Sequence, residues 1–303
     1  MNIAVTEPEA QLTLGEKMTW RERLNNSIGY FQSQRTLRKE YESRTLLVAN
    51  HWDGSVQQFY HFFLGYFMPL CLWLENNKTN HVAVRDCGPM NVWFELLRPG
   101  IDIEIMPPGA ALHAVVGDRM KFAVLQGMDD PRSFRKANLE SGIQAVLRQI
   151  GFVNPSPSES IDVLVIDRVT SESFYHGPDS ETHMSGKERR HVPNLKDLRL
   201  DESSGKNMKF VDFARIEPAD QLSLAQTSSA LVGQHGAGLV HMLWLRPGSH
   251  VVEIAPPLPV QVIEIFERLA QVLGHSYSRV PQEDVHSPVD LDELKNAIFS
   301  IQG

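Results

Sequence analysis

The stretch 230–254 has the residue types of a turn that binds phosphate. Its first apolar run ends at Gly233, and His235, Gly236, Ala237 and Gly238 follow before a second apolar run begins. The first N–H groups of a helix lack intrahelical partners and lie at its positive end, so a helix opening near Ala237 can hold the oxygens of a phosphate or diphosphate. The spacing agrees equally well with glycines that only allow tight strand–helix packing. The segment matches neither GxGxxG nor the P-loop, which argues against nicotinamide and kinase chemistry.

Two charged residues stand beside apolar runs that we expect to be parallel strands. Arg168 directly follows the run 162–167, and Glu253 lies in the run 251–254. The carboxyl ends of parallel strands border the ligand crevice of an open α/β sheet. A guanidinium with five fixed donors suits a departing diphosphate, and a carboxylate at a strand end can accept hydrogen bonds from a ribose. The simpler alternatives are a surface ion pair for Arg168 and a capping or solvated role for Glu253.

Metal-binding patterns are weak in this sequence. It has no HExxH motif, and its DxD, Asp290 to Asp292, stands where a helix is expected to begin, so we interpret it as a cap. His51 and His61 are ten residues apart, without a cysteine or acidic residue at matching spacing. We therefore expect no metal and no cofactor.

Composition and charge exclude several classes of protein. The 303 residues carry 37 acidic and 29 basic side chains, and the net charge of −8 argues against a general nucleic-acid binder. Two cysteines exclude a disulfide scaffold and a four-cysteine zinc site, and they indicate a reducing compartment. The first residues lack the basic and apolar regions of a secretion signal. We expect a cytoplasmic protein.

The most apolar segment, 59–74, is shorter than a membrane span. It contains His61, Gly65 and Pro69, and a span needs about 20 apolar residues. We therefore predict a buried helix.

Candidate strands and helices alternate along the chain, which is typical of an α/β fold with parallel sheets. A long helix is expected from Asp130 as cap and Pro131 as first helical residue to Ile150. The Pro/Ser-rich stretch 154–160 is typical of a connector between domains. A final helix is predicted over 290–302. The predicted strands are 45–50, 81–85, 101–106 and 121–126 in the first half, and 162–167, 231–233 and 251–254 in the second.

Together these segments resemble the family 61 glycosyltransferases, which include plant β-1,2-xylosyltransferases and protein O-linked N-acetylglucosaminyltransferases. The resemblance spans roughly 45–280 and is firmest after 210. The family's C-terminal signature is similar to HGAGL at 235–239, Pro247-Gly248 and VVEI at 251–254. Further similar segments are the helix 218–229 with Gln221, the runs 266–270 and 274–277, and an N-terminal "YH…PL" helix at Tyr60-His61 and Pro69-Leu70.

The resemblance implies a GT-B fold, in which two Rossmann-like lobes face each other. It implies an acceptor-binding lobe over 1–153, a nucleotide-sugar-binding lobe over 154–285, and a C-terminal helix over 286–303 that packs back on the first lobe. The HGAG turn becomes the site of the donor diphosphate. Arg168, Arg190 and Asn194 are similar to the family's "SRR…RRxxN" segment and are expected to bind the donor.

The resemblance also implies an inverting displacement, which needs a general base on the acceptor hydroxyl. Several relatives carry an acid in the helix after the "YH" pair, where this chain has Gly65 and Tyr66. Two candidates remain. Asp53 follows the first strand, where it also suits a turn before Gly54. His61 belongs to the "YH" pair, where it also suits a satisfied histidine inside an apolar helix.

The sequence thus predicts a metal-independent, inverting glycosyltransferase that moves a sugar from a nucleotide diphosphate donor, which we expect to be a UDP-sugar, to a glycan hydroxyl. A pathway of polysaccharide or lipopolysaccharide synthesis is expected, with a glycan or lipid-linked glycan acceptor that would bring the enzyme to the inner membrane. No nucleic-acid partner is expected, and the number of copies is left open. The alternatives are a glycan- or nucleotide-binding module without turnover, suggested by Gly65, and a Rossmann-type oxidoreductase.

Overall fold

The computed structural model divides the chain into two compact units. The N-terminal unit comprises residues 1–130 and 144–151, and the C-terminal unit comprises 131–143 and 152–303. The residues that the structure describes are 41, 43–77, 79–97, 99–116, 120–153, 160–182, 184–199 and 206–299. The predicted connector lies almost entirely outside these residues, as do the first forty residues, for which the absence of a secretion signal was predicted.

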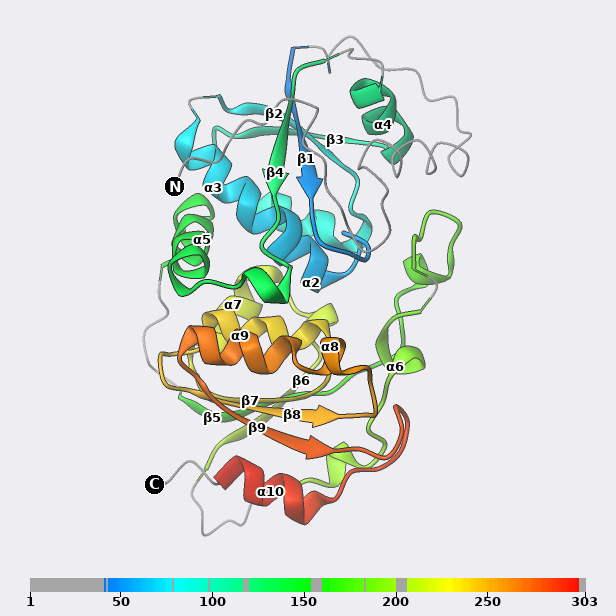
Figure 1. The fold of residues 1–303 in the computed structure, drawn as a ribbon, viewed down its shortest axis with the longest axis vertical. Helices are drawn as coiled ribbons and strands as arrows, with labels where there is room; N and C mark the ends of the chain where they lie inside the picture. Colours follow the sequence, from blue (N-terminus) through cyan, green and yellow to red (C-terminus); the bar gives the residue numbers. More distant parts are fainter. Residues whose placement is uncertain are drawn as a thin grey trace. The chain divides into compact units, whose positions relative to one another are not determined.

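The N-terminal unit is built on a parallel sheet of four strands in the order β3-β2-β1-β4 (Figure 1). The four predicted strands are all confirmed, because each apolar run forms one strand. Helix α4 packs with Leu46 and Ala83 in one core cluster. The strands and this helix are β1 (Thr45–Asn50), β2 (His81–Arg85), β3 (Asp102–Met106), β4 (Phe122–Gln126) and α4 (Pro108–Val116).

The apolar segment after β1 is a buried helix, as predicted. It consists of α2 (Phe59–Phe62), the π-helical turn η2 (Phe63–Phe67) and α3 (Met68–Asn76). All the side chains from Phe62 to Leu74 are buried. No helix within the described ranges is long and apolar enough to cross a membrane.

The helix expected from Pro131 begins later than predicted. Pro131 opens a separate 3-10 turn, η4 (Pro131–Ser133), and α5 (Lys136–Gln149) follows. The carbonyl of Arg135 accepts the amides of Asn138 and Leu139 and so starts the helix. The units divide after Asp130, inside α5 between Ile143 and Gln144, and again after Gly151, and the boundary expected at 153/154 stays a prediction.

The C-terminal unit contains a second parallel sheet, of five strands in the order β6-β5-β7-β8-β9. The three predicted strands form its centre, and the sheet is extended by β6 and β9. Figure 1 shows α7 and α9 on one face of this sheet and α10 on the other. These elements are β5 (Ile161–Ile166), β6 (Met208–Val211), β7 (Ser228–Gln234), β8 (His250–Ala255), β9 (Ser276–Pro281), α7 (Pro218–Gln226), α9 (Ile265–Leu273) and α10 (Leu291–Phe299). The predicted α/β fold is therefore confirmed.

The C-terminal helix packs on the sheet of its own unit, and its expected packing on the first lobe stays a prediction. Leu294 and Ile298 of α10 are buried in one cluster with strand residues of β5, β7 and β8. The helix contacts β8 and β9, and its Ala297 carbonyl lies 3.1 Å from Nε2 of His250. Asp290 caps the helix as predicted, because its Oδ1 accepts the amides of Asp292 and Glu293 at 2.9 and 3.0 Å.

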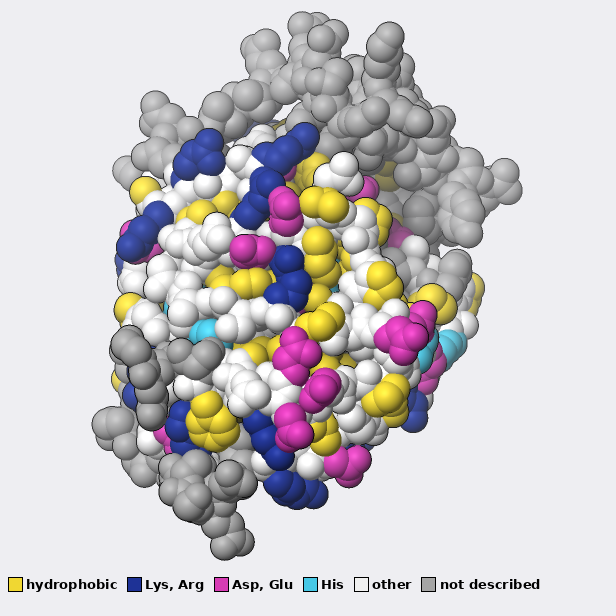
Figure 2. Space-filling view, turned by 60° about the horizontal axis from the view of Figure 1, so that its bottom comes forward, with side chains coloured by type: hydrophobic (Ala, Val, Ile, Leu, Met, Phe, Trp, Pro, Cys, Tyr) yellow, Lys and Arg dark blue, Asp and Glu magenta, His cyan; other side chains and the backbone are white. Residues whose placement is uncertain are grey.

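The surface mixes charges of both signs. On the face drawn in Figure 2, acidic and basic side chains alternate with apolar and uncharged ones over the described residues.

We expect Phe67 to be a main support of the N-terminal core. Its side chain has no exposed surface, and its ring centroid lies 5.5 to 6.0 Å from those of Phe62, Phe63, Trp93 and Phe94. Phe67→Ala should lower the free energy of unfolding by about 3–5 kcal/mol, because it removes buried area and leaves a cavity. Urea unfolding followed by tryptophan fluorescence measures this loss.

The control for this experiment is Val153→Ala, at a side chain that is 84% exposed. It should change stability by less than about 0.5 kcal/mol. Equal midpoints for the two variants would contradict the role given to Phe67.

Candidate functional site

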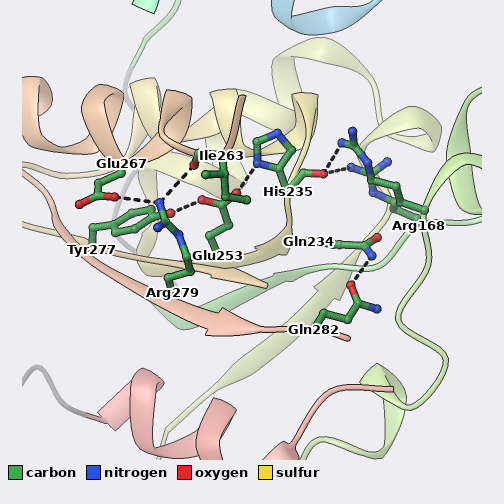
Figure 3. A network of polar contacts seen from close by, with 10 residues as sticks. Arg168, Gln234, His235, Glu253, Ile263, Glu267, Tyr277, Arg279 and Gln282 are labelled. Atoms are coloured by element: carbon green, nitrogen blue, oxygen red, sulfur yellow. Dashed lines mark hydrogen bonds and ion pairs between the residues drawn. The ribbon is translucent and has the colours of Figure 1, made fainter. Parts of the chain in front are cut away.

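The predicted glycine turn lies at the carboxyl end of β7 and gathers two arginines. After β7, Gly236 precedes the 3-10 helix η9 (Ala237–Trp244). Arg168 follows β5, which pairs with β7, and its Nη2 donates to the carbonyl of His235 at 3.1 Å (Figure 3). Nη1 of Arg190 donates to the same oxygen at 2.8 Å. The structure therefore brings together Arg168, Arg190 and the turn.

These guanidinium groups are crowded, and the buried carboxylate of Glu253 only partly offsets their repulsion by raising the pKa of Arg190. Burial and the proximity of Arg190 lower the pKa of Arg168 to about 9, and burial together with Arg189 lowers the pKa of Arg190 to about 10. Within the described parts of the chain, both donate to one neutral carbonyl and neither forms an ion pair. A bound anion would relieve this repulsion. The arrangement can therefore bind an oxyanion such as a diphosphate.

Gly236 is required by the close approach of Arg168. Its φ of 152° lies in a region that side chains rarely adopt. A Cβ at this position would collide with Nη2 of Arg168. The glycine thus makes room for the guanidinium beside the first turn of η9.

Glu253 lies inside β8, two residues before the strand end, and is fully buried. Its carboxylate accepts hydrogen bonds from Nδ1 of His235 and from the hydroxyl of Tyr277 (Figure 3). A ribose could reach it only after one of these donors moved. The ribose role stays a prediction, and the observed contacts give Glu253 another task, which is to fix the ring of His235.

Asn194 does not join the arginines at the turn. Its Nδ2 donates to the carbonyl of Val289 at 2.8 Å, and its Oδ1 accepts the amide of Val289 at 3.0 Å. The amide side chain is thus used to hold the segment before α10. Its predicted role in donor binding is not tested by these contacts.

The N-terminal unit contains a cluster of polar groups around Asp129, which was not predicted from the sequence. Asp129 follows β4 and is 1% exposed. Its Oδ2 lies 3.1 Å from Nδ1 of His61 and 3.8 Å from Nδ1 of His51, and its Oδ1 accepts the amide of Trp52 at 2.9 Å. The sequence signal that could have found Asp129 is its position just after a predicted strand, the same signal that selected Arg168.

The two predicted candidates for the base differ in their surroundings. Oδ1 of Asp53 accepts the amide of Gly54 at 2.8 Å, which is the turn role considered from the sequence. His61 instead pairs with the buried carboxylate of Asp129. Gly65 leaves the space that this pair needs, since a Cβ there would lie 2.7 Å from Cβ of His51 and 3.2 Å from the Asp129 carboxylate.

The same cluster is able to hold a metal ion. One ligand atom from each of His51, His61 and Asp129 lies within 4.8 Å of the others. Imidazole nitrogens and a carboxylate oxygen suit zinc and other divalent transition metals. The sequence argument that these histidines lack an acidic partner is therefore wrong. The expectation of a metal-independent protein stays a prediction.

The fold and the turn define a class: an α/β protein in which two arginines at the carboxyl ends of parallel strands can bind an anionic ligand. The family model for Glycosyltransferase 61 matches residues 59–252, more than half of the chain. The protein therefore belongs to glycosyltransferase family 61 and is a glycosyltransferase, which confirms the resemblance seen in the sequence. The family implies, in general terms, a nucleotide-sugar donor and a glycan acceptor. A search of the curated proteins found no match.

Gly236→Ala should weaken anion binding at the turn. The added methyl group would displace the guanidinium of Arg168 and remove a charge-assisted hydrogen bond, so the affinity for pyrophosphate should fall at least about 10-fold. Isothermal titration calorimetry with pyrophosphate measures the change.

Gly248→Ala is the matched control. Gly248 also has a positive φ, 77°, but a Cβ there would meet no atom within 4 Å. This variant introduces backbone strain without touching the arginines. Equal affinities for the two variants would show that Gly236 does not act through Arg168.

Proposed function

We propose that this glycosyltransferase transfers a sugar from a UDP-sugar to a glycan hydroxyl with inversion at the anomeric carbon. The observation that carries the proposal is the pair of arginines, Arg168 and Arg190, which share one carbonyl without a carboxylate partner among the described residues. Negative charge grows on the diphosphate as the sugar departs, and fixed guanidinium groups stabilise that charge. The amides of Ala237 and Gly238, at the start of η9, add donors to the same site.

In this proposal the two units are the two lobes of a GT-B enzyme. The C-terminal unit binds the donor through the glycine turn, and the N-terminal unit binds the acceptor and supplies the base, Asp53 or His61. The arginines provide the positive charge that a metal ion provides in other transferases, so the reaction is proposed to be metal-independent. The proposed setting is cytoplasmic synthesis of a polysaccharide or lipopolysaccharide, with a lipid-linked acceptor drawing the enzyme to the inner membrane.

The alternatives from the sequence have no observation in their favour. The binding module without turnover was motivated by Gly65, yet the Asp129 carboxylate lies 3.2 Å from where a Cβ at Gly65 would be. An acidic group therefore occupies this place although the helix does not provide one. The family match supports glycosyl transfer and gives no support to an oxidoreductase.

Arg168→Ala should lose donor binding and turnover together. Removing one charge-assisted donor should weaken UDP binding by roughly 10- to 150-fold and slow release of UDP from the productive UDP-sugar by about 10²-fold or more. Calorimetry with UDP and a UDP-release assay with a panel of UDP-sugars and glycan extracts measure both. Arg268→Ala is the control, since Arg268 pairs with Glu264 on the surface of the same unit.

The result that would overturn the proposal is equally concrete. If the unmodified protein shows no saturable binding of UDP or of any other nucleoside diphosphate, or if Arg168→Ala binds UDP as tightly as Arg268→Ala does, the arginine pair is not the donor site. Saturable binding of another nucleoside diphosphate in place of UDP would keep the site and change the donor.

A further inference from the structure

We propose that Nε2 of His61 removes the proton from the acceptor hydroxyl and that Asp129 is the residue that positions His61 for this step. The inference rests on the proposed function and chooses between the two bases that the sequence leaves open. In the step, Nε2 takes the hydroxyl proton while the oxygen forms a bond to the anomeric carbon. The bond from that carbon to the diphosphate breaks, and its electron pair leaves with the diphosphate. The proton then passes from His61 to solvent.

The first support is the rigidity of Asp129. Its side chain is buried, and its two carboxylate oxygens have separate partners: Oδ1 accepts the amide of Trp52 at 2.9 Å, and Oδ2 faces Nδ1 of His61 at 3.1 Å. Its backbone carbonyl accepts the hydroxyl of Tyr60 at 2.6 Å. The carboxylate is therefore held from the loop after β1, and the backbone of Asp129 is held by Tyr60, the residue before His61.

The second support is the tautomer that this contact selects. A carboxylate oxygen only accepts hydrogen bonds, so Nδ1 of a neutral His61 must carry the proton. Nε2 is then left with its lone pair, which is the state that a base needs. When Nε2 takes a proton, the imidazolium that results is stabilised by the adjacent carboxylate.

The third support is the space beside Nε2. In the described part of the chain, Nε2 of His61 has no hydrogen-bond partner. The backbone of Gly54 packs beside Nε2, where a Cβ would collide with the nitrogen. A glycine at this place, with φ 74°, therefore puts neither a side chain nor a polar group against Nε2. The side chain of His61 is 15% exposed, so part of it remains accessible to solvent.

His51 does not compete for the carboxylate. Its Nδ1 lies 3.1 Å from the carbonyl of Asp53 and 3.8 Å from Oδ2 of Asp129, so its proton is donated to the carbonyl. Burial lowers the pKa of His51, against the opposing effect of Asp129. His51 therefore uses its Nδ1 proton on the carbonyl of Asp53 and leaves Oδ2 of Asp129 to His61.

The decisive variant is Asp129→Asn. Its Oδ1 can still accept the Trp52 amide, but its NH₂ group would face Nδ1 of His61 and donate to it. His61 would then carry its proton on Nε2 and lose the lone pair. We expect kcat for UDP release to fall about 10²- to 10⁴-fold while the affinity for UDP stays within about twofold. His61→Gln should show the same pattern.

A second measurement does not depend on turnover. Long-range ¹H–¹⁵N spectra of the full chain report which ring nitrogen carries the proton, and His61→Gln assigns the signals. We expect protonated Nδ1 in the unmodified protein and protonated Nε2 in Asp129→Asn. If His61 already carries its proton on Nε2 in the unmodified protein, the proposal is wrong whatever the kinetics show.

The chain offers a matched control in Asp102→Asn. His81 and Asp102 form a pair of the same kind, Nδ1 to Oδ2 at 3.0 Å, but on the surface of the same unit. This variant should change neither UDP release nor the signals of His61. Full activity of Asp129→Asn would also contradict the proposal.

Measurements on the same samples distinguish two further outcomes. If EDTA removes the activity and Zn²⁺ restores it, with the His51 and His61 signals shifting together, the cluster is a metal site and the dyad is wrong. If UDP does not bind at all, the proposed function fails, whereas the ¹⁵N signals still test the pairing of His61 with Asp129.

Discussion

The arrangement of the arginines in the C-terminal unit depends on one carbonyl oxygen, which accepts hydrogen bonds from two guanidinium groups. Like charges at this distance are unfavourable unless the structure forces them together or an anion joins them. Here the oxygen is that of His235, whose ring is held by Glu253, while its amide donates to the carbonyl of Ile254 in the neighbouring strand. The sheet thus fixes the carbonyl, and the carbonyl fixes Arg168 and Arg190.

Buried hydrogen bonds also connect the helix after the turn, η9, to α7. Gln221 of α7 donates through Nε2 to the carbonyls of Phe213 and Ile216, and its Oε1 lies 2.8 Å from Nε2 of His241 in η9. The helix that opens at the turn is therefore tied to α7 by buried polar groups, and such groups are costly to leave unpaired. The helix with Gln221 and the 3-10 helix that follows the HGAG turn are thus in direct contact.

The features that were predicted correctly from the sequence are those that local residue patterns determine. Apolar runs predicted the strands, and the position of Arg168 after one of them predicted its place at the turn. The errors concern contacts that depend on packing over long distances. Asp129 lies 68 residues from His61, and neither spacing nor periodicity shows that β4 runs beside β1 and brings the two together. The burial of Glu253 was missed for the same reason, because the partner that covers it, Tyr277, belongs to the next strand.

Gly65 leaves space in the helix for a carboxylate that comes from another element, the segment after β4. The resemblance places an acid in the helix after the "YH" pair in several relatives, and a longer side chain at residue 65 would here meet His51 and the carboxylate of Asp129. One carboxylate can occupy this buried space, because two would repel each other and neither would be solvated. A glycine in the helix and an aspartate after β4 therefore form a consistent pair. The acid beside His61 is Asp129, which follows β4, and the helix does not provide it.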